Sequence, residues 1–364
     1  MVNPHAGKDI RRLVSAAGST SDAVKIGIVR RAAIGALEQG AERVLLSSDT
    51  HHLAERAVDG IDGRVELLDS PLSGSHHDTI AAARELFKRE AGAVIVLGGD
   101  GTCRDMATGW PDVPLIPIST GTNNVFPTDV DGTSAGVAAA LVATGAVPLA
   151  DVGAPANRIT IDIDDPRRDR AVSEIALVEA ALIDAAFVGA RAVSDPSSVR
   201  WVVACIADPS ATGLSSIAGR VHPVARDRPG AVLIHLGPGG RSVRVPLAPG
   251  SFSTLDVASV EALEPARSVE LPGGGVLAYD GERTTPVSAE ATVTVRVEPG
   301  GPRVIDVAAA LERAAGERRF DLRSSDTASH GSTDTTTDRT TDAANRTTTH
   351  SAASRDERED PDGH

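Results

Sequence analysis

The chain has 364 residues, of which 41% are hydrophobic, so it can bury the cores of two domains. Its 50 acidic side chains outnumber the 36 Lys and Arg, and the net charge of −14 argues against a general surface for nucleic acid or anionic membranes. Cys103 and Cys205 are too few for a disulfide framework, and no Cys/His cluster has the spacing of a zinc site.

No signal peptide opens the chain, and it contains no apolar run of about 18 residues, the length that a membrane-spanning helix needs. We therefore predict a cytoplasmic protein that does not bind membranes. Only three lysines occur, and an acidic, lysine-poor composition of this kind suggests a cytoplasm of high salt, in which hydrated carboxylates keep a protein soluble.

The first part of the chain alternates apolar runs with helical patterns, as a doubly wound α/β domain does. The predicted strands span 44–48, 65–68, 93–97 and 113–118, and the predicted helices span 26–39, 77–91 and 133–144. Ser75 or Asp78 is expected to cap the second of these helices, and Gly145 to end the third. We place this domain at residues 1–145.

The most informative motif follows the strand at 93–97, where residues 98–102 read Gly-Gly-Asp-Gly-Thr. Glycines at the end of a strand bring backbone N–H groups close to an anion, and no Cβ blocks the approach of a phosphate. Asp100 then lies at the rim of the sheet, where open α/β folds bind ligands. The alternative is a tight turn in which Asp100 only bonds to backbone amides.

A second polar loop, residues 119–124 (Ser-Thr-Gly-Thr-Asn-Asn), follows the strand at 113–118. Parallel neighbouring strands place their ends on the same edge of a sheet, so we expect the two loops to meet there. The side chains that can converge on one polyphosphate are those of Asp100, Thr102, Thr120, Thr122 and Asn123. Asn124 either completes this set or caps the next element.

From about residue 158 the pattern changes to short β-rich runs between Gly/Pro clusters, which predicts an all-β second domain over 146–303. Its predicted strands span 159–163, 174–182, 201–206, 231–235, 243–246, 276–279 and 293–297. Residues 307–319 are predicted as a closing helix, within 304–321. Residues 322–364 carry nine acidic against five basic side chains and almost no large apolar ones, so we predict an acidic disordered tail.

Three segments together carry a family resemblance: the loop at 3–8 (Asn-Pro-His-Ala-Gly-Lys), the motif at 98–102 and the segment 121–124. Their order and spacing resemble the NAD kinase/diacylglycerol kinase superfamily, most of all its ATP-NAD kinase-like branch, which includes the acetoin-catabolism X-proteins. Late in the chain, residues 277–282 (Leu-Ala-Tyr-Asp-Gly-Glu) match the Asp-Gly-Glu turn of the superfamily. The resemblance covers roughly residues 1–306.

The resemblance implies an NAD kinase-like fold, in which a doubly wound, Rossmann-like α/β domain that binds the nucleotide and its phosphates precedes an all-β substrate domain. It implies an ATP-dependent kinase that needs Mg²⁺ or another divalent cation. The first hypothesis is phosphorylation of the 2′-hydroxyl of the adenosine ribose of NAD, which gives NADP. The second is a kinase of the same fold that acts on a small metabolite of acetoin or 2-oxoacid catabolism, or on a lipid hydroxyl. The third is a non-catalytic nucleotide-binding regulator.

We expect the partners to be small-molecule substrates, NAD and ATP, with no nucleic acid and no membrane, and we expect a homo-oligomer. The resemblance implies that Asp100 is the general base, the ligand of the cation, or both, and that Glu282 is a second candidate base. The residues implied to bind the nucleotide are Asn3, Lys8, Gly98, Gly99, Gly101, Thr102, Thr120, Gly121, Thr122, Asn123, Asn124 and Asp280. Alternatively, Asp280 and Glu282 form a β-hairpin turn, because Asp-Gly is a strong hairpin signal, and Lys8 is only solvated.

Two departures from the family pattern concern the acceptor and the first strand. NAD kinases carry an Asn-Asn-Glu or Asn-Asp near the start of the β domain, which contacts the NAD ribose and adenine, and residues 172–190 contain no such pair. Only Met1 and Val2 precede the first loop, where the family has a full strand. We therefore expect the sheet position beside 44–48 or 93–97 to be largely empty, and we favour a start downstream of the true one.

Overall fold

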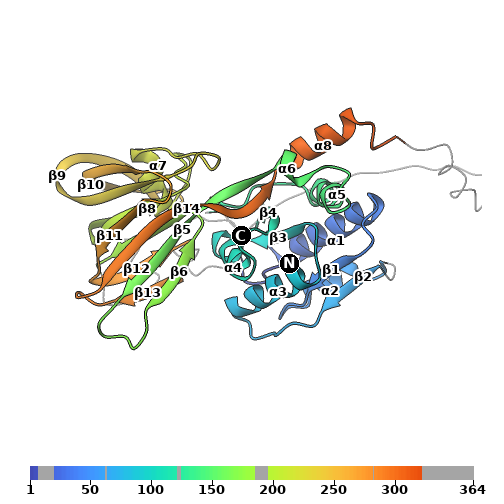
Figure 1. Ribbon diagram of the computed structural model, residues 1–364, viewed down its shortest axis with the longest axis horizontal. Coiled ribbons are helices and arrows are strands. Elements are labelled where there is room, and N and C mark those ends of the chain that lie inside the picture. Colours follow the sequence, from blue (N-terminus) through green and yellow to red (C-terminus); the bar gives the residue numbers. More distant parts are fainter. Residues whose placement is uncertain (7–19, 62–63, 121–123, 185–195, 282, 322–364) are drawn as a thin grey trace, which may run out of the picture. The chain divides into compact units, whose positions relative to one another are not determined.

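Strands and helices alternate in the first part of the chain, as the sequence predicts. The computed structural model describes residues 1–6, 20–61, 64–120, 124–184, 196–281 and 283–321 (Figure 1). Every element below lies within Met1–Phe320, one of two compact units. The first ten elements are α1 (Asp22–Glu38), β1 (Val44–Ser47), α2 (Leu53–Val58), β2 (Val65–Leu68), α3 (His76–Lys88), β3 (Val94–Gly98), α4 (Asp100–Gly109), β4 (Pro114–Ser119), α5 (Gly132–Ala143) and α6 (Leu149–Val152).

Local signals set the ends of these helices. α3 begins where the hydroxyl of Ser75, one of the two predicted caps, accepts a hydrogen bond from the amide of His77 at 3.3 Å. Gly145 follows the C-cap of α5 with a φ of 73°, which glycine adopts without steric strain. α4 begins at Asp100, with only Gly99 between it and the end of β3, so the glycine-rich motif is a short strand-to-helix junction.

Helices cover both faces of β3 and β4. Val94 and Val96 of β3 lie in a core cluster with residues of α3 and α4. Leu97 of β3 and Ile116 of β4 lie in a second cluster with residues of α1, α5 and the closing helix α8 (Val307–Gly316). Because successive side chains of a strand point to opposite faces, this division is that of a doubly wound sheet. The predicted α/β class of this part is confirmed.

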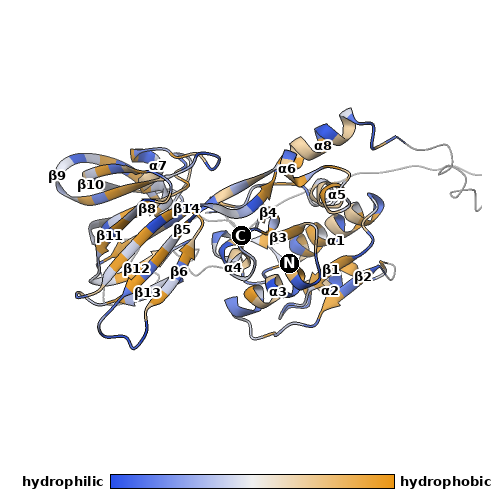
Figure 2. Cartoon of the chain, in the orientation of Figure 1, coloured by the Kyte–Doolittle hydropathy of each residue, from blue (hydrophilic) through white to orange (hydrophobic). Residues whose placement is uncertain are grey.

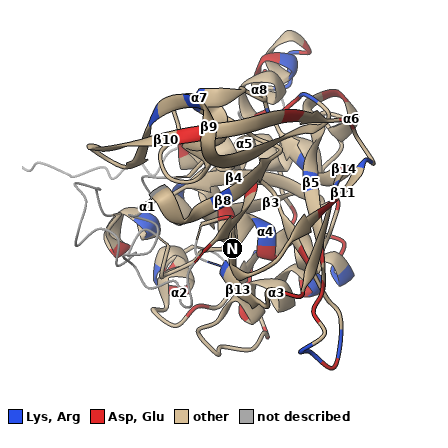
Figure 3. Cartoon of the chain, turned by 90° about the vertical axis from the view of Figure 1, so that its left-hand side faces the viewer, with Lys and Arg blue, Asp and Glu red and all other residues tan. Residues whose placement is uncertain are grey.

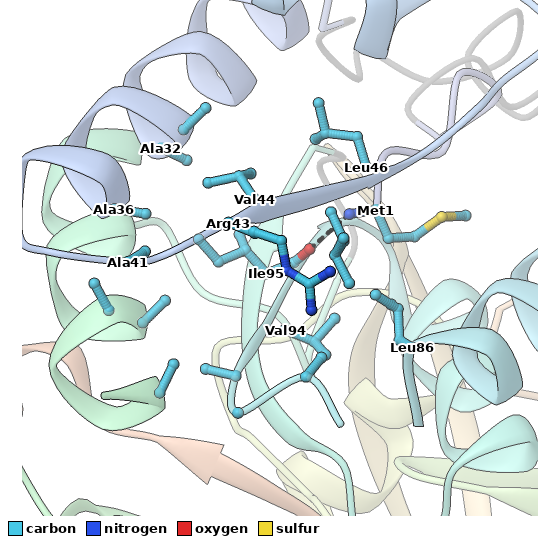
Figure 4. A pocket seen from close by; sticks show the side chains of 18 of the residues that line it. Met1, Ala32, Ala36, Ala41, Arg43, Val44, Leu46, Leu86, Val94 and Ile95 are labelled. Atoms are coloured by element: carbon cyan, nitrogen blue, oxygen red, sulfur yellow. Dashed lines mark hydrogen bonds between the residues drawn. The ribbon is translucent and has the colours of Figure 1, made fainter. Parts of the chain in front are cut away.

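A cavity of about 520 Å³ lies between β1 and β3 (Figure 4). β1 and β2 form a separate two-stranded parallel sheet, while β3 pairs with β4. Along β3, the Met1 amino group donates to the Ile95 carbonyl and the Asn3 amide to the Leu97 carbonyl, each at 3.0 Å. Burial lowers the pKa of the Met1 amino group to about 6. Mostly apolar residues of β1, β3, α1 and α5 line this cavity, where the sequence predicts an empty strand position.

The second part of the chain forms antiparallel ladders. Its strands are β5 (Gly153–Asp164), β6 (Val172–Ala176), β7 (Glu179–Ile183), β8 (Val199–Ala204), β9 (Ala231–Ala248), β10 (Ser251–Leu263), β11 (Ser268–Pro272), β12 (Gly275–Tyr279), β13 (Arg283–Val287) and β14 (Thr292–Ile305). One sheet has the order β10-β9-β8-β7-β12-β13. The other has the order β3-β4-β14-β5-β6, with β11 paired to β14. Figure 2 shows apolar and polar residues alternating along β5 and β14.

β14 pairs with β4 in parallel and with β5 antiparallel, so one sheet runs through both parts of the chain. Below, "α/β half" means Met1 to the end of α6, and "β-rich half" means β5 to β14. The predicted domain bounds of 1–145, 146–303, 304–321 and 322–364 stay predictions. The fold class of an α/β part followed by an antiparallel β part is confirmed.

Some strand predictions in the β-rich half are wrong in detail. The sequence predicts one strand over 174–182, but the structure has β6 and β7 there, in different sheets. The chain crosses from one sheet to the other between them. There Leu177 and Val178 lie outside both strands, and their amides donate to the side chain of Asp280. The predicted strands 231–235 and 243–246 both belong to β9, which pairs with β10 on either side of a bulge. The pattern also gives no sign of β10, β11 or the short helix α7 (Ser215–Val221).

The predicted closing helix is confirmed as α8, which begins where the Asp306 carboxylate accepts from the Ala309 amide at 3.0 Å. The predicted tail at 322–364 lies outside the described residues. Among the described residues visible in Figure 3, Lys and Arg are scattered between Asp and Glu rather than gathered on one element. In the described part of the chain, no helix is long and apolar enough to cross a membrane.

Candidate active site

The Gly-Gly-Asp-Gly-Thr motif forms the junction between β3 and α4. Gly99 is the N-cap of α4, and its carbonyl accepts from the amides of Thr102 at 3.0 Å and Cys103 at 3.1 Å. A Cβ added at Gly98 would lie 2.6 Å from the side chain of Thr102, so any other residue there would displace Thr102. The first amides of a helix have no partner within it and carry the positive end of its dipole. The junction is therefore suited to hold an anion such as a phosphate.

Asp100 is the first residue of α4, and only 7% of it is exposed. Its carboxylate accepts hydrogen bonds from the amides of Val125 at 3.0 Å and Phe126 at 2.8 Å. Burial raises the pKa of Asp100 to about 7; the Phe126 amide opposes that rise, and the negative charge of Asp280 adds to it. A carboxyl group with a pKa near neutrality can both take up and release a proton under ordinary conditions.

Asn3 of the loop at residues 3–8, called the first polar loop below, lies against this junction. The side-chain amide of Asn3 donates to the hydroxyl of Thr102 at 2.9 Å, so this loop contacts the Gly-Gly-Asp-Gly-Thr motif. Lys25 of α1, which is fully buried, donates to the carbonyl oxygens of Asn3 at 3.1 Å, Pro4 at 2.8 Å and Ala6 at 2.6 Å. Lys25 therefore organises the loop, a role that its place in a helical pattern did not indicate. Lys8 lies outside the described residues.

The second polar loop also reaches the junction, as predicted. The amide of Thr120 donates to the carbonyl of Gly98 at 3.3 Å. The Thr120 hydroxyl is buried and has no hydrogen-bond partner within the described ranges. The side chain of Asn124 donates to the hydroxyl of Ser119 at 3.0 Å, so it bonds back to β4 and does not cap α5. A Cβ at Gly99 would lie 2.7 Å from Asn124 Oδ1.

Three further residues of the second loop, Gly121, Thr122 and Asn123, lie outside the described residues. The structure thus brings together Asn3, Thr102, Thr120 and Asn124 with Asp100 and its glycines, at the ends of two adjacent parallel strands. It does not describe the residues at the centre of the second loop.

Asp280 lies in the turn of the β12–β13 hairpin, the structure that the Asp-Gly pair predicts. It has a φ of 45°, and Gly281 has a φ of 89°. Its fully buried carboxylate accepts from the amides of Leu177 at 2.7 Å, Val178 at 2.9 Å and Glu179 at 3.3 Å. Burial raises the pKa of Asp280 to about 6, against the charge of Arg104. These contacts make Asp280 a structural crosslink between the β12–β13 turn and the segment that joins β6 to β7. Glu282 lies outside the described residues.

The same turn touches α4. A Cβ added at Gly101 would lie 3.3 Å from the carbonyl oxygen of Asp280, so the absence of a side chain there allows the close approach. Arg104 of α4 donates to the carbonyl of Tyr279 at 3.2 Å. Asp105 accepts from both Arg104 and Arg283 at 3.1 Å. The Asp105–Arg283 ion pair and the hydrogen bond from Arg104 to Tyr279 join the two halves beside the junction, and no local pattern in the sequence indicates them.

Arg226 is a further residue that the sequence did not reveal. It lies between α7 and β9 and donates from Nη2 to the carbonyl oxygens of Val125, at 2.9 Å, and Phe126. Burial lowers the pKa of its guanidinium below the ordinary value, while the thiol of Cys103 and the carboxylate of Asp100 oppose that change. Cys103 itself is fully buried, as a small apolar residue would be, and burial raises the pKa of its thiol.

The protein groups near the junction can supply only part of a cation site. Among the described residues, no group of three or more His, Cys, Asp or Glu is placed to hold a metal ion. Oδ1 of Asp100 accepts from two amides, while Oδ2 accepts one longer hydrogen bond, from Val125 at 3.2 Å. Mg²⁺ is often held by one or two carboxylates together with water and phosphate oxygens. Asp100 Oδ2 fits that arrangement.

Comparison with known proteins finds two family models in the chain. Residues 28–147 match the ATP-NAD kinase N-terminal domain, and residues 157–300 match the acetoin catabolism protein X C-terminal domain. Over 331 residues the chain is 38% identical to acetoin catabolism protein X of Cupriavidus necator, a match that covers 86% of this chain and 91% of that protein.

Two solved structures have a similar fold. Yeast NADH kinase complexed with NADH is 13% identical, with a TM-score of 0.48 over 81% of this chain and 86% of that one. An NAD kinase from Archaeoglobus fulgidus in complex with ATP is 15% identical, with a TM-score of 0.36 over 77% of this chain and 100% of that one. Both TM-scores are below 0.5.

Proposed function

Because the chain belongs to the family of acetoin catabolism protein X, and its α/β half matches the ATP-NAD kinase domain, we propose that it is an ATP-dependent kinase. The proposed reaction transfers a phosphoryl group to the 2′-hydroxyl of the adenosine ribose of NAD and gives NADP. Family membership supports the kinase-type phosphotransferase with ATP as donor. The observation that carries the proposal is the buried Asp100, with a pKa raised to about 7, at a glycine-lined helix start.

Asp100 is proposed as the general base. Its carboxylate would accept the proton of the attacking hydroxyl, a task for which a pKa near the working pH is favourable. The hydrogen bonds from Val125 and Phe126 hold the carboxylate in one orientation, which positions it for that transfer. The shorter hydrogen bonds from these two amides are both to Oδ1. In the described part of the chain, Oδ2 accepts only one longer hydrogen bond, so it has a lone pair for another partner.

The surrounding groups are proposed to bind the phosphates. The amides at the start of α4 supply partial positive charge, and Gly98, Gly99 and Gly101 leave the backbone accessible to phosphate oxygens. The buried Thr120 hydroxyl and the Asn3–Thr102 pair add hydrogen-bonding groups. Phosphoryl transfer depends mainly on positioning and charge neutralisation, so a site of this composition suits it.

A divalent cation, Mg²⁺ in the simplest case, is proposed to be held by Asp100 Oδ2 together with the ATP phosphates. When bound, it would neutralise charge on the phosphates during transfer. Glu282, Lys8, Gly121, Thr122, Asn123 and Asp280 stay proposed site residues; the contacts of Asp280 favour a supporting role. The homo-oligomeric state and the cytoplasmic location also stay predictions.

One observation favours the alternative of a non-catalytic nucleotide-binding regulator. Asp100 already accepts three hydrogen-bond contacts from two amides, as a purely structural turn residue also would.

The identity of the phosphoryl acceptor is a separate open choice, since residues 172–190 lack the family's Asn-Asn-Glu or Asn-Asp pair.

A coupled assay of NADP formation from NAD, ATP and Mg²⁺ tests the proposal. It should be run at low and at molar salt, because the chain is acidic and poor in lysine. Turnover with NAD supports the proposed reaction. Turnover only with a small hydroxy compound or a dispersed lipid would identify a different acceptor. ATP binding by calorimetry without turnover on any acceptor would identify the regulator.

A further inference from the structure

Val125 and Phe126 are held on both sides by side chains from different halves of the chain. Asp100, at the start of α4, accepts hydrogen bonds from both of their amides, at 3.0 and 2.8 Å. Arg226 of the β-rich half donates from Nη2 to both of their carbonyl oxygens, at 2.9 Å for Val125. The backbone of two consecutive residues is therefore held by a carboxylate at its amides and by a guanidinium at its carbonyls.

The surroundings of Arg226 differ from those of an ordinary ion pair. Its Cζ lies 4.7 Å from the centroid of the Phe126 ring, at a distance typical of a cation–π contact. No carboxylate within the described ranges forms a salt bridge with it, whereas Arg104 pairs with Asp105. A cation removed from water needs compensating contacts, and here two carbonyl oxygens and an aromatic face provide them.

The turn that carries Arg226 is anchored on both sides. Before it, Val224 exchanges two backbone hydrogen bonds with Ala207, at 2.9 and 3.1 Å. After it, the carbonyl of Arg228 accepts from the side chain of Asn157 at 2.6 Å. Because its turn is fixed to β-rich elements, Arg226 transmits the position of that half to the segment that Asp100 holds.

We propose that Arg226 is a positioning residue, which fixes Val125 and Phe126 against Asp100 and makes the placement of these two residues, which follow the second polar loop, depend on the β-rich half. The inference rests on the proposed kinase function, in which the second polar loop binds phosphates and Asp100 faces the hydroxyl. Without Arg226 the carbonyl groups of both residues are released, while the Asp100 side chain is still present. Misplaced reacting groups slow the chemical step more than they weaken nucleotide binding.

Native-state hydrogen exchange, followed by NMR on the full chain, measures this anchoring without any activity. In Arg226→Gln the amides of Val125 and Phe126 should exchange at least about tenfold faster than in the wild type, since local opening becomes easier. Arg226→Lys keeps a donor cation and should give intermediate rates. Unchanged exchange of both amides in Arg226→Gln would overturn the proposal.

The matched control is Arg228→Gln, two residues further along the same turn. Its side chain is exposed and forms no hydrogen bond or ion pair among the described residues, while its backbone carbonyl makes the Asn157 contact. This variant removes the same charge, and the amides of Val125 and Phe126 should exchange at the wild-type rate. Equal acceleration in both variants would show a general effect of charge and contradict the assignment to Arg226.

Kinase kinetics test the consequence for the reaction. For Arg226→Gln, kcat should fall about tenfold or more while KM for ATP stays within about twofold, because positioning acts on the chemical step. A rise in KM with kcat unchanged would overturn the positioning role. If the wild type phosphorylates no hydroxyl acceptor, the proposed function is wrong. The exchange rates of the two amides then still decide whether Arg226 holds Val125 and Phe126.

Discussion

Two buried aspartates, one in each half of the chain, use the same hydrogen-bond chemistry in different surroundings. Asp100 accepts from two amides of the segment before α5, and Asp280 accepts from three amides where the chain passes from β6 to β7. Burial raises the pKa of both, to about 7 and about 6. Asp280 lies inside a crossing between two sheets, whereas Asp100 begins a helix among glycines at a strand end. The two carboxylates are alike in their hydrogen bonds, so the backbone around each one is what makes Asp280 a structural crosslink and Asp100 a candidate base.

The largest effect that this comparison predicts is on activity. Asp100→Asn should lower kcat by on the order of 100-fold or more, because the neutral amide cannot serve as a base and is a weaker cation ligand than a carboxylate. The fold should be kept, since Asn is isosteric and its carbonyl can still accept from a backbone amide. Kinase assays and a thermal melt measure the two properties separately.

The matched control for this substitution is Asp69→Asn, an exposed position of the α/β half. It should behave as the wild type in both measurements. Asp100→Asn activity within a few-fold of the wild type would refute the catalytic role of Asp100 and remove the contrast with Asp280.

Asp280→Asn should act mainly on stability. A neutral amide has one acceptor oxygen for the three amides, so buried donors lose partners at about 1–3 kcal/mol each. We expect the free energy of unfolding in urea to fall by about 2–4 kcal/mol. The exposed Asp169→Asn, in the same half, is the control and should change it by less than about 0.5 kcal/mol. A loss no larger than that of the control would show that the crossing does not depend on this carboxylate.

The two raised pKa values predict opposite pH trends for stability and activity. Both carboxyls have an ordinary pKa of 3.8 and hold protons in the folded state up to about pH 6 to 7, where the unfolded chain has already released them. Their contribution to stability therefore falls as the pH rises from about 4 to 7. Activity should rise towards pH 7 and above, because the base must be deprotonated.

Urea unfolding of the wild type and of Asp280→Asn at pH 5, 6 and 7 measures the stability part of this prediction. As the pH rises, the free energy of unfolding should fall less for the variant than for the wild type, since the variant has no titrating carboxyl at position 280 and keeps only that of Asp100. Parallel pH profiles for the two proteins would contradict the raised pKa of Asp280.

The smallest expected effect concerns the cavity between β1 and β3. An added segment of about five apolar, β-branched residues before Met1 should raise Tm by several degrees, because it can pair with the open edge of β3 and fill apolar space. It would also replace a buried amino group by a peptide N–H. A Gly-Ser extension of the same length is the control. Equal melting temperatures for the two extended chains would show that the cavity does not take a strand.

Much of the fold and of the Asp100 junction is predictable from the sequence because the signals are local. Apolar runs mark β3 and β4, glycines mark the strand ends, and Asp-Gly marks the β12–β13 hairpin. The order of two parallel strands then places Thr102 and Thr120 at one edge of the sheet. Each of these inferences needs only residues that are near in sequence, or a general rule about adjacent strands.

Other features have no local signal. The division of 174–182 into β6 and β7 lies where backbone amides bond to Asp280, about 100 residues further along the chain. Lys25 lies in a helical pattern, and only packing shows that its amino group organises the first loop. The long strand β9 crosses a Pro-Gly-Gly cluster that the sequence pattern marks as a break, because pairing with β10 continues on both sides of it.

The sequence by itself determined many of the elements, the α/β-then-β order and the glycine-lined position of Asp100, because strand and helix periodicity and turn chemistry act over a few residues. The tertiary structure alone decided what surrounds that carboxylate. Arg226 meets Phe126 across 100 residues of chain. Burial raises the pKa of Asp100, and the charge of Asp280, in a turn of the other half, adds to that rise. Burial and long-range hydrogen bonds arise only when distant segments pack together, so local patterns do not encode them.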